Sequence, residues 1–255
     1  FYLTDHPADA HWLTDKQRTW LINTLAQEER NKPLVVGVQP TKGQMIRKAL
    51  CNRQVWLLAL VYFGITSGSN AMNFFMPTVL ASFRGTFGLE IGLMQNGLIT
   101  AIPYAVAAVA MIWWSRRSDR LQERHWHAGG AAMLAAVSIA VALWLNQPWI
   151  IVIGFILLAM GVYSAINVFW AVPGQVLTGV GAAVGIGLIN SIGNLSGFIG
   201  PYLTGYLFTV TGSYTPGFLV IAALVGLGGL GMVLMPRNKE SQIGAALAPA
   251  TGGKA

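Results

Sequence analysis

Residues 128–172 read AGGAAMLAAVSIAVALWLNQPWIIVIGFILLAMGVYSAINVFWAV. This stretch contains two apolar segments, each close to the about 20 residues that cross a bilayer, on either side of the polar break Asn146-Gln147-Pro148. It belongs to a longer run, residues 125–236, in which 112 consecutive positions carry no Asp, Glu, Lys or Arg. A surface that faces water needs charge, whereas the interior of a bilayer excludes it. The sequence therefore predicts an all-α membrane protein that crosses the bilayer several times.

Six segments are long and apolar enough to span a membrane, and charged or turn-forming residues separate them. They are residues 55–83, 92–114, 128–146, 149–172, 182–206 and 216–235. Fifteen of the 16 Lys and Arg residues then lie on one face of the membrane, and only Arg84 lies on the other. Because Lys and Arg concentrate in cytoplasmic loops, both termini are predicted to be cytoplasmic. This placement accounts for the net charge of +7 without a nucleic-acid partner.

Polar segments flank the six spans, which together form a predicted membrane domain at 55–236. Residues 1–54 are expected to form a cytoplasmic loop with a linker at 31–43 and an amphipathic helix, for which Thr14 and Gln17 are spaced as a capping box. Residues 237–255 are rich in Ala, Gly and Pro and are expected to be a disordered cytoplasmic tail. The single cysteine, Cys51, excludes an internal disulfide and a Cys-based metal cluster. The chain starts without a Met, and we interpret it as part of a longer protein.

Polar residues follow one helical face in three of the spans. Each set has the spacing i, i+4, i+7: Thr66, Asn70 and Asn73; Tyr163, Asn167 and Trp170; Gly187, Asn190 and Asn194. The second span adds Asn96, Thr100 and Tyr104 less regularly, whereas the third and sixth spans have almost no polar interior residue and are expected to face lipid. Amides in hydrocarbon need partners, so the polar faces are predicted to point inward. They could either join helices by hydrogen bonds or line a cavity for a hydrophilic solute.

The charged stretch Arg116-Arg117-Ser118-Asp119-Arg120-Leu121-Gln122-Glu123-Arg124 separates the second and third spans. It resembles the motif G-x-x-x-D-R-x-G-R-R of the major facilitator superfamily at Asp119, Arg120 and Arg124, and departs from it at Ser115, Gln122 and Glu123. Further stretches resemble the anion:cation symporter family, which includes permeases for 4-hydroxyphenylacetate, phthalate and tartrate: Trp12-Leu13-Thr14 with Glu28-Glu29-Arg30, Phe169-Trp170, and Ile189-Asn190-Ser191-Ile192-Gly193-Asn194. The resemblance covers nearly the whole chain. It implies the C-terminal half of a twelve-helix bundle, helices 7 to 12, with the central loop before it.

The resemblance also implies roles for individual residues. Small organic carboxylates would bind between the two halves, coupled to H⁺ or alternatively to Na⁺, without a cofactor or metal. The expected substrate-binding residues are Asn70, Asn73, Tyr163, Asn167, Trp170, Asn190 and Asn194. Asp119, with Arg120 and Arg124, would latch one access state by lying under the start of helix 11, where a helix dipole favours negative charge. The alternative for Asp119 is an ordinary charged loop that sets topology.

Groups that could carry a proton or a counter-charge are missing from the predicted spans, which contain no Asp, Glu, Lys, Arg or His. These groups are expected in the N-terminal six-helix half, the partner that this chain lacks. We therefore expect a secondary transporter in the bacterial inner membrane that is inactive as this chain alone. The alternative is a truncated membrane fragment without transport activity. An intramembrane protease is disfavoured because no span offers a His base, and a channel because no carboxylate ring or filter loop is present.

Overall fold

The structure is a computed structural model that describes residues 7–31, 41–88, 92–177 and 181–236. The chain divides into two compact units, Phe1–Thr41 and Lys42–Ala255. The predicted tail at 237–255 and most of the predicted linker lie outside the described residues. The boundary between the units precedes α2 (Lys42–Leu50), so this helix lies in the second unit.

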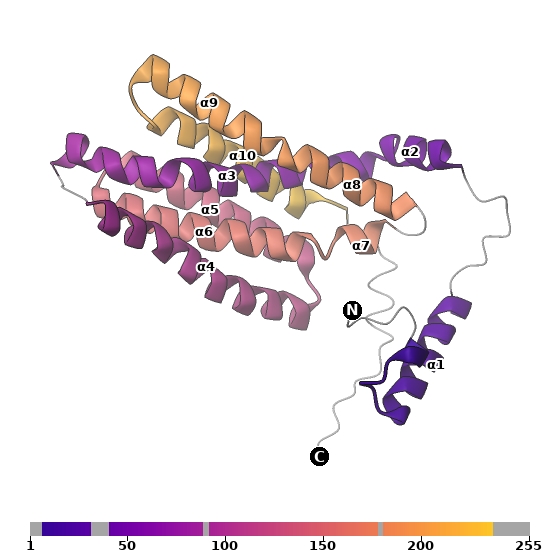
Figure 1. Cartoon of the computed structure of the whole chain (residues 1–255). Coiled ribbons are helices and arrows are strands. Elements are labelled where there is room, and N and C mark those ends of the chain that lie inside the picture. The colour runs from indigo at the N-terminus through magenta and orange to yellow at the C-terminus, as the bar shows by residue number, and fades with distance from the viewer. Residues whose placement is uncertain (1–6, 32–40, 89–91, 178–180, 237–255) are drawn as a thin grey trace. The chain divides into compact units, whose positions relative to one another are not determined.

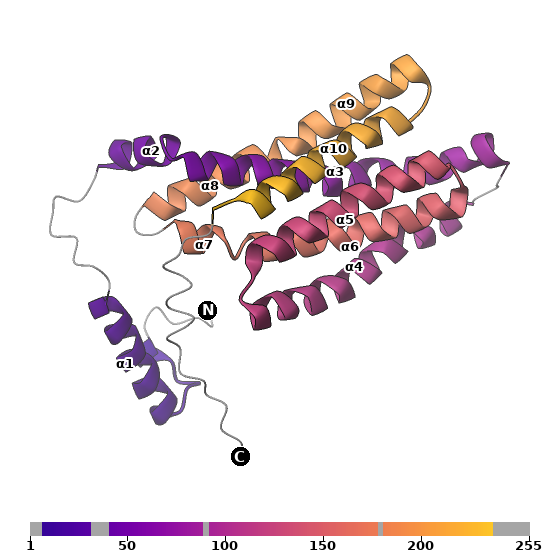
Figure 2. The same ribbon diagram turned by 180° about the vertical axis from the view of Figure 1, so that it is seen from behind.

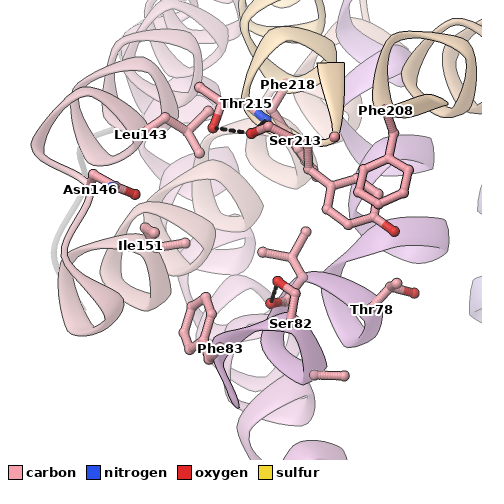
Figure 3. A pocket seen from close by; sticks show the side chains of 14 residues that line it. Thr78, Ser82, Phe83, Leu143, Asn146, Ile151, Phe208, Ser213, Thr215 and Phe218 are labelled. Carbon is pink, nitrogen blue, oxygen red and sulfur yellow. Dashed lines mark hydrogen bonds between the residues drawn. The ribbon is translucent and has the colours of Figure 1, made fainter. Parts of the chain in front are cut away.

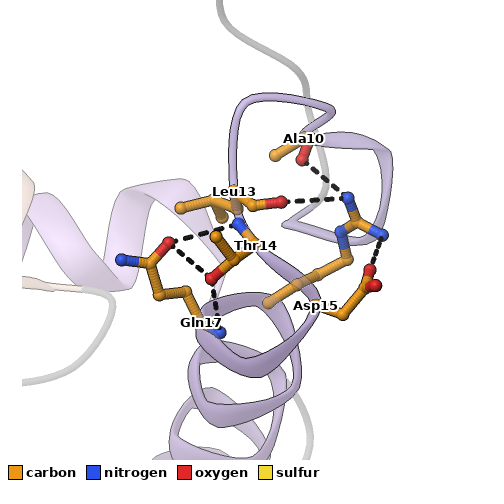
Figure 4. Close-up of polar contacts among 6 residues, drawn as sticks. Ala10, Leu13, Thr14, Asp15 and Gln17 are labelled. Carbon is orange, nitrogen blue, oxygen red and sulfur yellow. Dashed lines mark hydrogen bonds and ion pairs between the residues drawn. The ribbon is translucent and has the colours of Figure 1, made fainter.

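The first unit contains a short 3-10 helix, η1 (Pro7–Asp9), and the helix α1 (Asp15–Asn31). Thr14 and Gln17 cap the start of α1 reciprocally, as Figure 4 shows: the Thr14 N–H donates to Gln17 Oε1 over 3.1 Å, and the Gln17 N–H donates to Thr14 Oγ1 over 3.4 Å. The predicted capping box is therefore confirmed. The neighbouring Arg18 side chain donates to the carbonyl oxygens of Ala10 and Leu13, which ties the preceding turn to the helix.

The second unit contains six helical segments that are long and apolar enough to cross a membrane, as predicted. They are α3 (Arg53–Phe87), α4 (Leu93–Leu121), α5 (Arg124–Leu145), α6 (Pro148–Phe169), the pair α8 (Gly181–Asn194) and α9 (Ser196–Thr211), and α10 (Thr215–Leu234). A short helix, α7 (Pro173–Val176), follows α6. No strand occurs in the described ranges.

Helices α5 and α10 form one layer behind α3 and α6. They are partly hidden in Figure 1 and come to the front in the reversed view of Figure 2, and α5 packs against both α6 and α10. Small residues allow this close approach. A Cβ atom added to Gly161 of α6 would lie 2.4 Å from the carbonyl oxygen of Ala131, and one added to Gly129 of α5 would lie 2.6 Å from that of Gly229. The layer is therefore held by helix backbones in near contact.

Two helix boundaries differ from the prediction. Helix α4 continues through Arg116 and Asp119 to Leu121, so most of the predicted charged loop forms the last turns of a helix. A helix can continue beyond the hydrocarbon, and basic residues near its C-terminal end favour its dipole. The fifth predicted span is two helices that meet at Leu195 rather than one continuous helix. Hydropathy does not reveal this break, because both sides are equally apolar.

Candidate functional site

Asn73 joins three helices on the polar face of the bundle. Its Oδ1 atom accepts a hydrogen bond from the Tyr104 hydroxyl of α4 over 2.7 Å and a longer one from the Tyr163 hydroxyl of α6 over 3.4 Å. The two tyrosine rings lie 6.0 Å apart, centroid to centroid. Two donors saturate the Asn73 carbonyl oxygen, and its Nδ2 atom has no hydrogen-bond partner among the described residues. Because Asn73 is exposed, it offers amide N–H donors to the space in front of it.

Tyr104 was not among the predicted site residues, although its contact with Asn73 is the shortest in this cluster. The feature of the sequence that could have identified Tyr104 is its spacing of four residues from Thr100, which in turn follows Asn96 by four. In the structure the Asn96 Nδ2 atom donates to the Pro77 carbonyl oxygen of α3 over 2.9 Å, and the Thr100 hydroxyl donates to Asn96 Oδ1 over 3.2 Å. The polar face of α4 therefore serves first to hold α4 against α3.

Asn70 belongs to a buried hydroxyl network at the break between α8 and α9. Its Nδ2 atom donates to Ser196 Oγ over 2.9 Å. The Thr66 hydroxyl lies 3.0 Å from Ser196 Oγ and 3.0 Å from the Gly193 carbonyl oxygen. Thr66 and Ser196 are both buried. A side chain of α3 thus hydrogen-bonds a carbonyl oxygen at the end of α8, which stabilises the break.

Asn190 and Asn194 are both exposed on α8 and pair with each other rather than with another helix. The Asn194 Nδ2 atom donates to the backbone oxygen of Asn190 over 2.9 Å and to its Oδ1 atom over 3.0 Å. The second bond uses one of the two lone pairs of Asn190 Oδ1, and the Asn190 Nδ2 atom has no partner in the described part of the chain. Asn190 therefore resembles Asn73 in presenting amide donors.

The remaining predicted residues lie at helix contacts. Trp170 packs edge-on against Tyr62 with ring centroids 4.9 Å apart, so its ring is half-buried rather than free. Tyr62 in turn lies where a Cβ atom on Gly193 would come within 2.0 Å of its ring, so only glycine allows α8 this close. Asn167 donates through Nδ2 to the Ser115 hydroxyl of α4 over 3.1 Å. The substrate-binding role of these residues stays a prediction.

The predicted latch residues lie at the corner between α4 and α5. Asp119, near the end of α4, forms an ion pair with Arg124, the first residue of α5, while Arg120 is exposed. The carboxylate thus closes the α4–α5 corner, and its predicted contact with the start of helix 11 stays a prediction. Nearby, His127 is buried, and the Trp114 indole N–H donates to its carbonyl oxygen over 2.9 Å.

Figure 3 shows a cavity of about 560 Å³. It lies at the end of the bundle opposite the α4–α5 corner, as the positions of the helix turns in Figures 1 and 2 show. It is lined by the end of α3, the α5–α6 turn and the α9–α10 turn, and we call it the distal cavity. None of the predicted site residues lines it. The described residues also contain no cluster of three His, Cys, Asp or Glu that could hold a metal ion. The polar face on α3, α4, α6 and α8 therefore remains the candidate substrate site.

Comparison with known proteins places this arrangement in a family. The model of the Major Facilitator Superfamily matches residues 1–201. The chain belongs to the major facilitator superfamily. It is 34% identical over 243 residues to a putative tartrate transporter of Agrobacterium vitis, covering 95% of this chain and 51% of that protein. It is 34% identical over 228 residues to a quinolone resistance transporter of Acinetobacter baumannii, covering 89% of this chain and 50% of the relative. The inner membrane transport protein RhmT of Escherichia coli is 33% identical over 230 residues, with 90% and 50% covered.

The chain thus spans about half the length of the major facilitator relatives that it matches. Its six membrane helices fit the C-terminal half of that fold. The predicted resemblance to tartrate-type permeases is confirmed, and the relatives named here are transporters rather than enzymes.

Proposed function

We propose that this chain forms the C-terminal half of a secondary transporter that carries small organic carboxylates by alternating access. The observation that carries the proposal is the orientation of Asn73, whose carbonyl oxygen is saturated by two tyrosine hydroxyls. Asn190 likewise accepts a hydrogen bond at its side-chain oxygen, from Asn194, and its Nδ2 atom has no partner among the described residues. Two exposed amides then present N–H donors, which suit a carboxylate better than a cation. The similarity to a putative tartrate transporter supports a hydroxylated dicarboxylate as the first substrate to test.

We also propose that the driving ion is H⁺ and that the groups that bind it lie in the N-terminal half. The described spans contain amides, hydroxyls and aromatic rings at the polar face, and no carboxylate lies among them. Such a surface can bind and orient a solute, but it cannot take up a proton at physiological pH. Transport by this chain therefore requires the other six helices.

The decisive experiment is uptake of radiolabelled tartrate into proteoliposomes under an imposed pH gradient. This chain is reconstituted alone and together with a separately expressed N-terminal six-helix half. We expect uptake only from the pair, and we expect Asn73→Ala to raise the KM about tenfold because it removes the oriented amide. Thr209→Ala is the control, since this exposed hydroxyl bonds only within its own helix in the described structure. Uptake by this chain alone, or an unchanged KM in Asn73→Ala, would contradict the proposal.

The proposed cytoplasmic position of both termini can be tested with the single cysteine. Cys51 is exposed and precedes α3 by two residues, on the side that carries the basic residues. A membrane-impermeant maleimide should label Cys51 in inside-out vesicles and leave it unlabelled in right-side-out vesicles. The variant Cys51→Ser with Ser213→Cys should reverse this pattern, because Ser213 lies in the turn at the opposite end of the bundle. Labelling of Cys51 in right-side-out vesicles would overturn the orientation.

A further inference from the structure

The distal cavity has a floor of aromatic rings. Phe218 is only 1% exposed and packs edge-on against Phe155 with centroids 5.3 Å apart. Beside it, the Phe208 and Tyr214 rings are stacked at 4.2 Å. Aromatic surfaces of this kind favour an aromatic ligand, which can stack on one ring while meeting the edge of another.

The rim of the distal cavity is polar but uncharged. It carries hydroxyls of Thr78, Ser82, Ser213 and Thr215 and the amide of Asn146, as Figure 3 shows. Ser82 donates to the Val79 carbonyl oxygen within α3, and Ser213 donates to Thr215 over 3.2 Å. The side chains of Thr78 and Asn146 have no hydrogen-bond partner among the described residues, which leaves them for a ligand. No described lining residue is charged.

The tryptophans beside the cavity indicate where it lies between the centre of the membrane and the water. Trp144 and Trp149 flank the α5–α6 turn that forms one wall, and they are 83% and 68% exposed. Exposed tryptophans are typical of the boundary between lipid and water. The distal cavity therefore opens where amphiphilic molecules accumulate from the membrane and from solution.

We propose that the distal cavity is a second binding site, separate from the candidate substrate site, for an uncharged aromatic alcohol. Its aromatic floor would hold the ring, and its hydroxyl and amide rim would hold the alcohol group. A carboxylate or ammonium group would lose hydration without gaining an opposite charge from the described lining, so both are disfavoured. The volume of about 560 Å³ lies within the range of small-molecule pockets.

The site differs from the candidate substrate site in both position and chemistry. The polar face offers amide donors from Asn73 and Asn190, whereas the distal cavity offers hydroxyls over aromatic rings. Helix α3 contributes to both sites. Asn73 belongs to the candidate substrate site, and Thr78, in the next turn of the helix after Pro77, lines the distal cavity. Binding in the distal cavity does not depend on the proposed transport function and can be measured on this chain alone.

The experiment is photolabelling of the purified chain in nanodiscs with a benzyl alcohol that carries a trifluoromethyl-diazirine. Crosslinked peptides are identified by mass spectrometry. We expect saturable labelling on the peptides that contain the end of α3 and the α9–α10 turn. Unlabelled benzyl alcohol should compete about tenfold better than benzoate or benzylammonium of similar size. Equal competition by benzoate or benzylammonium would overturn the uncharged class of ligand.

Variants locate the binding site. Ser82→Phe, which places a ring in the cavity, should lower saturable labelling about fivefold. Thr209→Phe adds the same ring to an exposed position of α9 outside the cavity and is the matched control. If Ser82→Phe does not fold, Thr78→Phe fills the cavity from the preceding turn. Unsaturable labelling spread over lipid-facing residues, or a co-purified lipid that blocks labelling, would show that the cavity is not a site for small alcohols.

Discussion

The contacts of α5 with α6 and α10, and the contact between α3 and the α8–α9 pair, hold their helices together by different means. In the first, backbones approach until a single added Cβ atom would lie 2.4 Å from a carbonyl oxygen, as at Gly161. In the second, the Thr66 and Ser196 hydroxyls and the Asn70 amide form hydrogen bonds across the interface. The close contacts of α5 allow one packing by steric fit. At the contact of α3, the hydroxyl and amide groups could exchange hydrogen-bond partners. The candidate substrate site lies with the polar contact.

The largest expected effect comes from disturbing the close contact between α5 and α6. In Gly161→Ala the new Cβ atom would lie 2.4 Å from the Ala131 carbonyl oxygen and 2.7 Å from the Ala135 Cβ atom, so α5 and α6 must separate. We expect a loss of about 1–3 kcal/mol in the free energy of unfolding, measured by denaturation in mixed micelles. Gly130→Ala is the control, because a Cβ atom there meets nothing within 4 Å. Equal stability of the two variants would show that the close approach of α5 and α6 does not stabilise the bundle.

A smaller effect is expected at the polar contact. Thr66→Val keeps the shape of the side chain but removes the hydroxyl that bonds the Gly193 carbonyl oxygen and contacts Ser196. We expect the free energy of unfolding to fall by about 1–2 kcal/mol and Thr66→Ser to restore it. The same denaturation assay applies. Thr209→Val serves as the reference, and a change there as large as at Thr66 would mean that the interhelical bonds contribute nothing beyond local helix effects.

The smallest effect is expected at the edge of the polar face. Tyr104→Phe removes the 2.7 Å hydrogen bond to Asn73 and leaves only the longer bond from Tyr163 to orient the amide. In the reconstituted transporter we expect the KM for tartrate to rise about fivefold, corresponding to about 1 kcal/mol, with stability unchanged. Tyr202→Phe is the control, since this exposed ring stacks on Phe198 within α9. A KM that moves equally in both variants would remove Tyr104 from the site.

Much of the fold could be predicted from the sequence because the bilayer imposes a simple rule on composition. A segment without charge that is long enough to cross the membrane becomes a helix, and the structure contains all six predicted spans. The rule fails at the ends, since a helix such as α4 can continue among Arg and Asp residues in water. The rule also fails at Leu195, where α8 and α9 are separate helices. This break is stabilised by the Thr66 hydroxyl of α3, and the hydropathy of the segment does not predict that contact.

The candidate site was harder to predict, because helical spacing shows which residues share a face but not what they touch. Asn70 and Asn73 lie on one face of α3, as predicted, yet one joins the α8–α9 break and the other joins two tyrosines. Asn194 pairs within its own helix, which no periodicity distinguishes from a contact between helices. Tyr104 was missed although it continues the four-residue spacing of Asn96 and Thr100, because spacing alone does not show that its hydroxyl bonds Asn73.

The uncharged run at residues 125–236 contains α6 to α10 and all of α5 except Arg124, and it also bears on how the protein enters the membrane. The α5–α6 and α9–α10 hairpins turn at Asn146 and Gly212, both with positive φ, and neither turn carries a charge. Moving one Arg or Lys into the centre of a membrane costs about 2.5–3.5 kcal/mol on translocon scales. In the proposed orientation these turns cross the bilayer during biosynthesis with only polar, neutral side chains. Each hairpin can therefore insert as a pair of helices without electrical work against the membrane potential.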